Sequence, residues 1–359
     1  MDCNKRYFTK KLLLWNNNLN TRLMPWKGEK DPYKIWLSEI ILQQTRVEQG
    51  WNYYNRFIIT FPNIEKLAKA PQEKIFKLWE GLGYYTRCKN LIETAKFIAK
   101  EKQGEFPGNY HDILLLKGVG PYTAAAIASF AFNLPHAVVD GNVFRVLARF
   151  FGIETAIDSS TGKKSFTALA EELLDKKLPG IYNQAIMDFG AVICKPKNPL
   201  CGVCPLKSKC IALLQNKINL LPVKLGKLIK KNRWFYYLII DYKGKIYVKK
   251  RGPRDIWENL YEFILLEAKE LLSLEQIKQN ALFKALAAKN TIKIIQVSKM
   301  YTQQLTHQTI HGLFIQLHVK NALPLKNYKT VTYKELPKLP FPKFITAYLA
   351  ENELQAFER

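Results

Sequence analysis

Residues 114–126 read Leu-Leu-Leu-Lys-Gly-Val-Gly-Pro-Tyr-Thr-Ala-Ala-Ala, and this stretch decides the predicted fold. The pattern predicts an apolar helix that ends at Gly118, because glycine readily takes the left-handed conformation of a helix C-cap. Pro121 suits the first position of a following helix, since its φ angle is already helical. The turn and the new helix N-terminus present backbone N–H groups, an arrangement that binds phosphate. A helix–helix turn without any ligand has the same pattern.

The sequence around this turn predicts a helical first half. Asp31-Pro32 indicates the start of one helix, with Pro at its first position. Strand patterns are absent from residues 31–211, so we expect this half to be all-α. Further helices are expected near residues 51–59, 63–69, 72–80, 86–102, 110–117, 121–131, 141–150, 162–175 and 180–193.

The pattern changes after Cys210, where residues 211–232 are Lys-rich, contain Pro and Gly, and indicate a linker. Residues 234–241 and 245–251 predict two strands joined by a turn at Tyr242-Lys243-Gly244. A helix is expected over about 268–289, strands at 292–301 and 311–320, and a C-terminal helix near 342–356. We therefore expect an α+β second half. The predicted domain boundaries are 1–215, a linker at 216–232, and 233–359.

The charge of the chain points to a polyanionic partner. The 359 residues carry a net charge of +25, and cations that contact phosphates release counterions. The segment from Cys194 to Arg233 holds only basic charged residues. Surface lysines that merely keep the protein dissolved are the alternative explanation. No apolar run is long enough for a membrane span or a signal-peptide core, so we expect a soluble cytoplasmic protein.

Four of the six cysteines lie within one short segment, with the spacing C-x6-C-x2-C-x5-C: Cys194, Cys201, Cys204 and Cys210. In an intracellular protein such a group indicates metal binding rather than disulfides. Four thiolates on one compact loop favour a [4Fe–4S] cluster, and zinc is the alternative. The cluster need not be redox-active, because it can simply fold the loop. Lys195 and Lys197, with Lys207 and Lys209, would then face phosphate.

Glu39 is a candidate general acid. On a helix that continues to Arg46, the spacing puts Glu39, Gln43 and Arg46 on a narrow stripe beside apolar residues, with Ser38 opposite the core. An acid among apolar neighbours has a raised pKa, which suits proton donation. The alternative, equally consistent with the sequence, is that Glu39 is an ionised carboxylate paired with Arg46 or with a distant Lys.

Asp140 is a second candidate, and it is the only acidic residue between Asp112 and Glu154. It stands at the start of a predicted helix, where Asp is a common N-cap. The two roles are compatible, since the helix dipole favours the ionised carboxylate, and that anion can stabilise a developing cation. One protonated and one ionised carboxyl is the division of roles that cleavage of a glycosidic bond requires.

Together these features resemble the MutY adenine DNA glycosylases of the helix-hairpin-helix superfamily, which includes endonuclease III. The resembling stretches are Met24-Pro25-Trp26, Asp31–Arg46, Trp79–Tyr85, Leu116–Thr123, Val139–Asn142 and the four Cys. The resemblance implies a helical region at about 30–135 and a module formed by 1–29 and 136–215 that carries a [4Fe–4S] cluster. It also implies a Nudix-like C-terminal domain.

The resemblance also implies roles for individual residues. Glu39 would protonate a flipped-out adenine, Asp140 would stabilise the sugar cation, and Tyr122 and Asn142 would position these groups. Endonuclease III-like enzymes carry a nucleophilic Lys at the position of Tyr122, so this chain resembles a monofunctional enzyme. Contacts to DNA are expected from these residues: Gln44, Thr45, Tyr84, Gly118, Val119, Gly120, Lys195 and Lys197.

Gln303-Gln304-Leu305-Thr306-His307 resembles the loop by which the family contacts 8-oxoguanine, with Leu305 at the position of the usual Phe. The Nudix hydrolase core is absent from the sequence, and His307 with His311 lacks a third metal ligand. We therefore expect a monomeric enzyme that removes adenine opposite 8-oxoguanine or guanine in duplex DNA. The alternatives are an endonuclease III-like lyase and a non-catalytic iron–sulfur DNA-binding protein.

Overall fold

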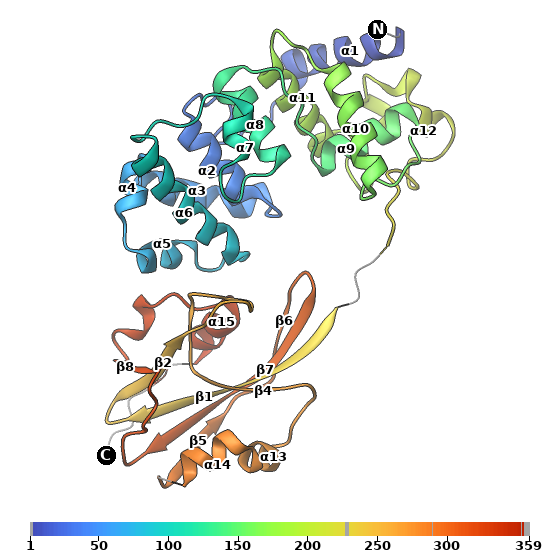
Figure 1. Cartoon of the computed structure of the whole chain (residues 1–359). Helices are drawn as coiled ribbons and strands as arrows, with labels where there is room; N and C mark the ends of the chain where they lie inside the picture. Colours follow the sequence, from blue (N-terminus) through green and yellow to red (C-terminus); the bar gives the residue numbers. More distant parts are fainter. Residues whose placement is uncertain (1–2, 227–229, 289, 353, 355–359) are drawn as a thin grey trace. The chain divides into compact units, whose positions relative to one another are not determined.

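A computed structural model describes residues 3–226, 230–288, 290–352 and 354. The chain forms two compact units that interleave along the sequence (Figure 1). The first comprises Met1–Ala70 and Lys89–Gly226, and the second comprises Pro71–Cys88 and Lys227–Arg359. Among the described residues, no helix has both the length and the apolar character needed to cross a bilayer.

The first unit is built from helices, as the sequence predicts. Asn63, Asn109 and Ser159 each cap a helix with a side-chain oxygen, and Pro residues occupy the first position of three helices. The elements are α1 (Cys3–Leu19), α2 (Pro32–Leu42), α3 (Val47–Thr60), α4 (Ile64–Lys69), α6 (Tyr85–Glu101), α7 (Tyr110–Leu114), α8 (Pro121–Phe132), α9 (Gly141–Phe151), α10 (Ser160–Leu173), α11 (Pro179–Val192), the 3-10 turns η1 (Cys201–Val203) and η2 (Lys207–Lys209), and α12 (Ile211–Leu214).

Two features of this unit differ from the sequence prediction. Helix α1 is present where no helix was expected. Helix α2 ends at Leu42, because Gln44 takes a left-handed φ of 57° that a helix cannot contain. The predicted stripe of Glu39, Gln43 and Arg46 on one helix is therefore wrong. Ser38 is also buried rather than opposite the core, since α2 is buried on almost every side.

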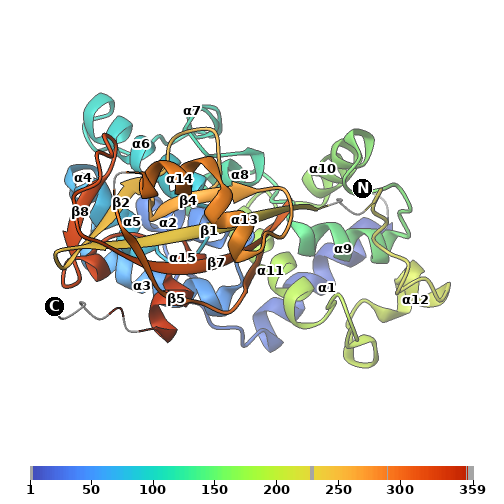
Figure 2. The ribbon, with the colours of Figure 1, turned by 90° about the horizontal axis from the view of Figure 1, so that it is seen from below.

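One hydrophobic core of the first unit brings its N-terminal helix α1 together with helices from its C-terminal part. Phe8 and Leu12 of α1 pack with Phe150 of α9, and Trp15 meets Phe189 of α11 edge to face. Figure 2 shows α1, α9, α11 and α12 gathered around this core. Helix α11 crosses from this core to α8, so it connects the two ends of the helical unit.

The second unit contains a mixed sheet with the order β3-β2-β1-β7-β5, in which β1 and β7 are parallel and the other pairs are antiparallel. Strand β4 pairs with β1, β6 with β7, and β8 with β2. The elements are α5 (Gln72–Trp79), β1 (Lys231–Tyr242), β2 (Lys245–Lys250), β3 (Tyr261–Glu262), β4 (Ile264–Ala268), α13 (Leu274–Gln279), α14 (Ala281–Ala287), β5 (Ile292–Val297), β6 (Tyr301–Gln304), β7 (Gln308–Val319), β8 (Lys329–Thr332), η3 (Leu336–Lys338) and α15 (Lys343–Glu351).

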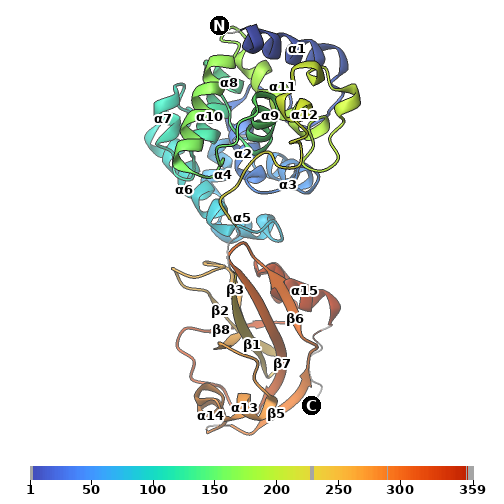
Figure 3. The ribbon, with the colours of Figure 1, turned by 90° about the vertical axis from the view of Figure 1, so that its right-hand side faces the viewer.

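The side chains of β1 alternate between two covered faces of this sheet. Tyr236 and Leu238 pack in the core with α13 and α14, whereas Tyr237 points to Phe314 and Phe344 on the side of α15. Figure 3 shows β1 and β7 side by side between these helices. This confirms the α+β expectation. The single helix predicted over 268–289 is instead two short helices, and the strand predicted over 292–301 is split into β5 and β6.

Candidate active site

Glu39 lies on α2 with only 5% of its surface exposed. Burial raises the pKa of its carboxyl to about 7, a hydrogen bond from the hydroxyl of Tyr122 acts to lower it, and the nearby charge of Asp140 acts to raise it. No Lys, Arg or His in the described part of the chain forms an ion pair with Glu39. A buried carboxyl without a cation holds its proton near neutral pH, which is the state a general acid needs.

Asp140 is the N-cap of α9, and its carboxylate has several donors. One oxygen accepts a hydrogen bond from the Val143 backbone N–H at 2.7 Å, and the other accepts one from Asn142 Nδ2 at 2.7 Å. Burial raises the pKa of Asp140, and these donors, together with the guanidinium of Arg145, oppose that rise. The N-cap role expected from the sequence is therefore confirmed for Asp140.

Tyr122 stands in the first turn of α8 and contacts Glu39. Its hydroxyl is hydrogen-bonded to Glu39 and lies 3.7 Å from the sulfur of Met187. Burial, reinforced by the two acids, raises the pKa of Tyr122 well above its ordinary value, so the hydroxyl is neutral. The structure thus brings Glu39, Tyr122, Asp140 and Asn142 together from three helices.

A cavity of about 200 Å³ opens beside Glu39. Trp26, Ile35 and Phe130 supply apolar surface, and polar side chains from α1, the segment before α2, and α11 supply the rest. The sequence indicated Trp26 but not the polar members of the wall, which are Asn16, Lys27, Glu29, Lys30, Ser38 and Gln184.

The predicted hairpin is formed by α7, a tight turn and α8. Gly118 has a φ of 79°, and a Cβ there would meet the side chain of Asn90 at 2.8 Å, so the turn requires glycine. Gln43 Nε2 donates to Thr123 Oγ1 at 3.2 Å and ties the end of α2 to the start of α8. Gln44 and Thr45 follow directly, and Gln44 is exposed.

In the second unit, Tyr84 is 44% exposed and has a left-handed φ of 50°. Its hydroxyl lies 3.0 Å from Thr306 Oγ1, and the guanidinium of Arg87 lies over its ring at 5.0 Å. Leu305, Thr306 and His307 form the turn between β6 and β7, which is closed by the Leu305 N–H bonded to the Gln308 carbonyl at 2.8 Å. His307 is therefore in a turn rather than on a strand with His311.

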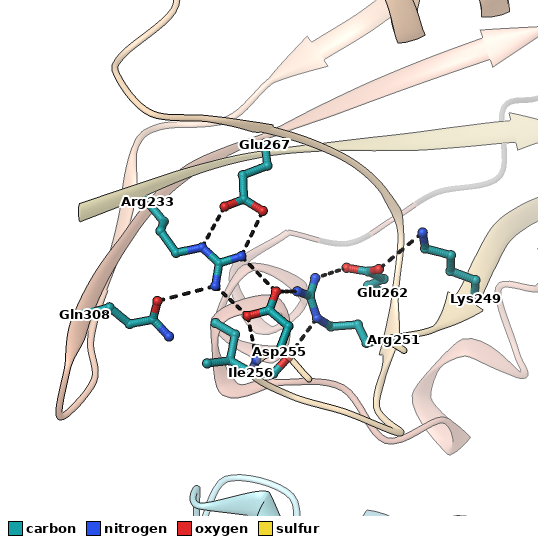
Figure 4. Close-up of polar contacts among 8 residues, drawn as sticks. All are labelled: Arg233, Lys249, Arg251, Asp255, Ile256, Glu262, Glu267 and Gln308. Atoms are coloured by element: carbon teal, nitrogen blue, oxygen red, sulfur yellow. Dashed lines mark hydrogen bonds and ion pairs between the residues drawn. The ribbon is translucent and has the colours of Figure 1, made fainter. Parts of the chain in front are cut away.

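A network of ion pairs supports the sheet next to this turn (Figure 4). Arg233 bonds both Asp255 and Glu267, and its Nη1 lies 3.4 Å from Oε1 of Gln308, the residue that follows the turn. Arg251 joins Asp255 to the buried Glu262. Although burial opposes it, the bonds from Arg233 and from the Ile256 N–H lower the pKa of Asp255 to about 2.

The four cysteines are free thiols that lie close enough to influence one another. Burial raises the pKa of Cys204 to about 12, a backbone N–H opposes this, and the other three thiols add to it. No three His, Cys, Asp or Glu side chains among the described residues converge on a single ion. Buried Arg149 donates to Cys194 Sγ at 3.5 Å and holds the carbonyls of Lys195 and Pro196. Arg149 therefore fixes one of the four thiols and the backbone that follows it.

Comparisons with known proteins support these observations. Residues 37–174 match the HhH-GPD superfamily of base excision DNA repair proteins, and residues 235–351 match the NUDIX domain. These matches confirm the fold classes expected for the two halves. Relatives named adenine DNA glycosylase include one from Buchnera aphidicola subsp. Baizongia pistaciae, 37% identical over 91% of this chain and 90% of that protein. Another, from Homo sapiens, is 40% identical over 57% of this chain and 39% of that protein.

Solved structures agree with the fold of the helical half. A thermostable thymine-DNA glycosylase is 31% identical, with a TM-score of 0.55, over 59% of this chain and 97% of that one. An endonuclease III in a non-covalent DNA complex is 20% identical, with a TM-score of 0.52, over 60% and 99%. At that identity the second likeness concerns the fold alone.

Proposed function

Because this chain belongs to the adenine DNA glycosylase family, we propose that it removes adenine mispaired with 8-oxoguanine or guanine in duplex DNA. The observation that carries the proposal is a buried acid, Glu39, that lines a cavity, has a pKa raised to about 7, and has Tyr122 and the donor-rich carboxylate of Asp140 in its surroundings. The basic composition supports a polyanionic substrate. The adenosine leaves the base stack and enters the cavity.

The proposed reaction is hydrolysis of the N-glycosidic bond. Glu39 donates its proton to N7 of adenine, which makes the base a better leaving group. The C1′–N9 bond breaks, its electron pair leaves with the base, and positive charge develops on the sugar. Asp140 stabilises that charge, and water adds to C1′ with loss of a proton. Tyr122 and Asn142 hold the two carboxyl groups through the hydrogen bonds described above.

The enzyme is proposed to be monofunctional because Tyr122 is a hydroxyl where a lyase needs an amine. A neutral phenol forms no Schiff base with the sugar, so the strand stays intact after base release. Borohydride reduction during turnover tests this. We expect no covalent protein–DNA adduct, and efficient trapping through a lysine would instead favour the endonuclease III-like alternative.

The proposed DNA contacts fall into two groups. The Gly118-Val119-Gly120 turn, Lys195 and Lys197 bind phosphate. Gln44 and Tyr84 insert into the duplex, and Thr45 contacts DNA. The left-handed φ angles of Gln44 and Tyr84 support this, since such strain is often stored at functional sites. Leu305, Thr306 and His307 contact 8-oxoguanine, supported by the bond between Thr306 and Tyr84.

A [4Fe–4S] cluster is the proposed cofactor, held by Cys194, Cys201, Cys204 and Cys210. When bound it supplies four metal–thiolate bonds that fold the loop and present Lys195 and Lys197. Iron and acid-labile sulfide analysis of the purified protein tests this, and stoichiometric zinc without sulfide would contradict it. The domain boundaries, the monomeric state and the cytoplasmic location remain predictions.

One glycosylase assay separates the candidate functions. Duplexes that contain adenine opposite 8-oxoguanine, adenine opposite guanine, or thymine glycol are incubated with enzyme and analysed with and without alkali. We expect release from both adenine duplexes, faster with 8-oxoguanine, and strand cuts only after alkali. Cuts without alkali at thymine glycol would indicate a lyase, and tight binding without any release would indicate a non-catalytic protein.

A further inference from the structure

Asp188 of α11 is a carboxylate that the proposed reaction does not use. It is completely buried, with 0% of its surface exposed. Four donors reach its two oxygens, three from the segment between α1 and α2 and one from α11 itself. These are Arg22 Nη1, Asn20 Nδ2 and Gln184 Nε2, each at 2.8 Å, and Lys27 Nζ at 3.1 Å. A buried carboxylate with this many partners fixes the side chains around it.

The partners of Asp188 form one wall of the cavity beside Glu39. Lys27 and Gln184 line the cavity, and Asn16 lines it while accepting a hydrogen bond from Asn20 at 2.7 Å. Asp188 itself is not among the lining residues. It therefore acts on the cavity only through the groups that it holds.

The network also places charge at the wall of the cavity that Glu39 lines. Arg22 and Lys27 are two cations, and Asp188 ion-pairs with both. The other charged or titratable groups around Glu39 are Tyr122 from α8, Asp140 and Arg145 from α9, and Glu29 and Lys30 in the cavity wall. Glu29 is paired with Lys34 outside the wall.

We propose that Asp188 is a positioning residue that holds the polar wall of the base-binding cavity and neutralises Lys27 there, so that Glu39 keeps its proton. This inference rests on the proposed function, in which Glu39 donates its proton to adenine. The Arg22, Lys27 and Asp188 group carries one net positive charge. Loss of Asp188 leaves two, and a stronger positive field favours the ionised form of Glu39.

The test is the pH profile of single-turnover adenine release. Release requires protonated Glu39, so the rate falls as pH rises through the pKa of that carboxyl, which gives an alkaline limb. Asp188→Asn should move this limb to lower pH, by on the order of one unit. Lys27→Gln should move it to higher pH, because the group is then neutral. The double variant restores one net positive charge and should return the limb to its wild-type position.

These outcomes separate the inference from the proposed function. A wild-type enzyme that releases no adenine contradicts the function. A wild-type alkaline limb that stays in place in both single variants, with folding verified by circular dichroism, contradicts the role of Asp188 alone. If Asp188→Asn does not fold, Lys27→Gln provides the test. An alkaline limb that is unchanged in Lys27→Gln, or that moves to lower pH, overturns the inference. A purely structural role predicts slower release without any movement of the limb.

Discussion

Two buried glutamates, one in each unit, show how the same side chain serves opposite purposes. Glu39 and Glu262 are similarly buried, with 5% and 3% of their surfaces exposed. Glu262 is ion-paired with Arg251 and lies 3.6 Å from Lys249. Burial raises the pKa of Glu262, and these cations offset part of the rise. Glu39 instead has a phenol and a second acid as its neighbours.

This difference indicates that burial keeps a carboxyl protonated near neutral pH only where no cation is paired with it. In the second unit the buried charges are matched, so the network stabilises a sheet and a turn. In the first unit, Lys27 of the cavity wall is ion-paired with Asp188, and among the described residues no cation is paired with Glu39. The following experiments test that contrast.

Glu39→Gln should give the largest effect. Glutamine fills the same space but donates no proton, so single-turnover adenine release should fall by about 10²–10⁴-fold. Binding to the mismatched duplex should persist, as measured by fluorescence anisotropy. Glu48→Gln, at an exposed position on α3, is the matched control and should release adenine normally. A near-normal rate in Glu39→Gln would remove Glu39 from the reaction.

Arg251→Met should destabilise the second unit by about 3–5 kcal/mol, because it leaves Glu262 buried without its main partner. The measurement is denaturant unfolding followed by fluorescence of the tryptophans. The double variant Arg251→Met with Glu262→Leu removes both charges and should recover most of the loss. No change in the single variant would mean that Glu262 is protonated in the folded protein, like Glu39.

Asp140→Asn should slow adenine release by about 10²–10³-fold, since the sugar cation loses its anion. Asparagine is an equally good N-cap, so the stability of α9 should be retained. Comparing single-turnover rates with melting temperatures separates the two roles. A variant that melts early but releases adenine at the normal rate would leave only the capping role.

Glu39→Gln should also raise stability above neutral pH. The pKa of Glu39 rises from 4.5 in the unfolded chain to about 7 when folded. Between those values the unfolded chain releases a proton that the folded protein keeps, so wild-type stability falls as pH rises. The effect amounts to at most about 3 kcal/mol and is absent in the variant. Equal pH dependence of unfolding in both proteins would contradict the raised pKa.

Tyr122→Phe should give the smallest effect, a shift of the pH profile. The hydroxyl of Tyr122 favours the ionised form of Glu39, so its removal should raise the pKa of Glu39 further. The alkaline limb of single-turnover release should therefore move to higher pH. Movement to lower pH would mean that Tyr122 accepts, rather than donates, the hydrogen bond to Glu39.

Local sequence signals predicted the fold where they were strong. The pairing of Gly118 with Pro121 predicted the hairpin, and residues 234–251 predicted the strands β1 and β2 with the turn between them. The limits of α2 were missed because Gln43 and Gln44 carry no helix-ending signal, and only the φ angle of Gln44 reveals the break. The helix predicted over 268–289 failed because Asn280 caps a second, separate helix inside an otherwise helical pattern.

The candidate site was predictable in part. Glu39 and Asp140 were noticeable because each is an acid in an apolar setting, and the structure places both beside Tyr122. Asp188 has the same signature on α11, yet the sequence alone assigns it no role. Its importance depends on donors from residues 20–27, more than 160 positions away, and no local pattern reports contacts at that separation.

Because the two units interleave along the sequence, truncating the chain in one place should unfold a helix far away in the sequence. Helix α5 belongs to the second unit, where Glu73 accepts a hydrogen bond from the hydroxyl of Tyr261 at 2.6 Å and Lys77 Nζ reaches the Leu339 carbonyl at 3.2 Å. A chain truncated after Gly226 would lose these partners and leave α5 unsupported. Amide protons of residues 72–79 would then exchange rapidly with solvent, although the deletion begins some 150 residues further along the chain.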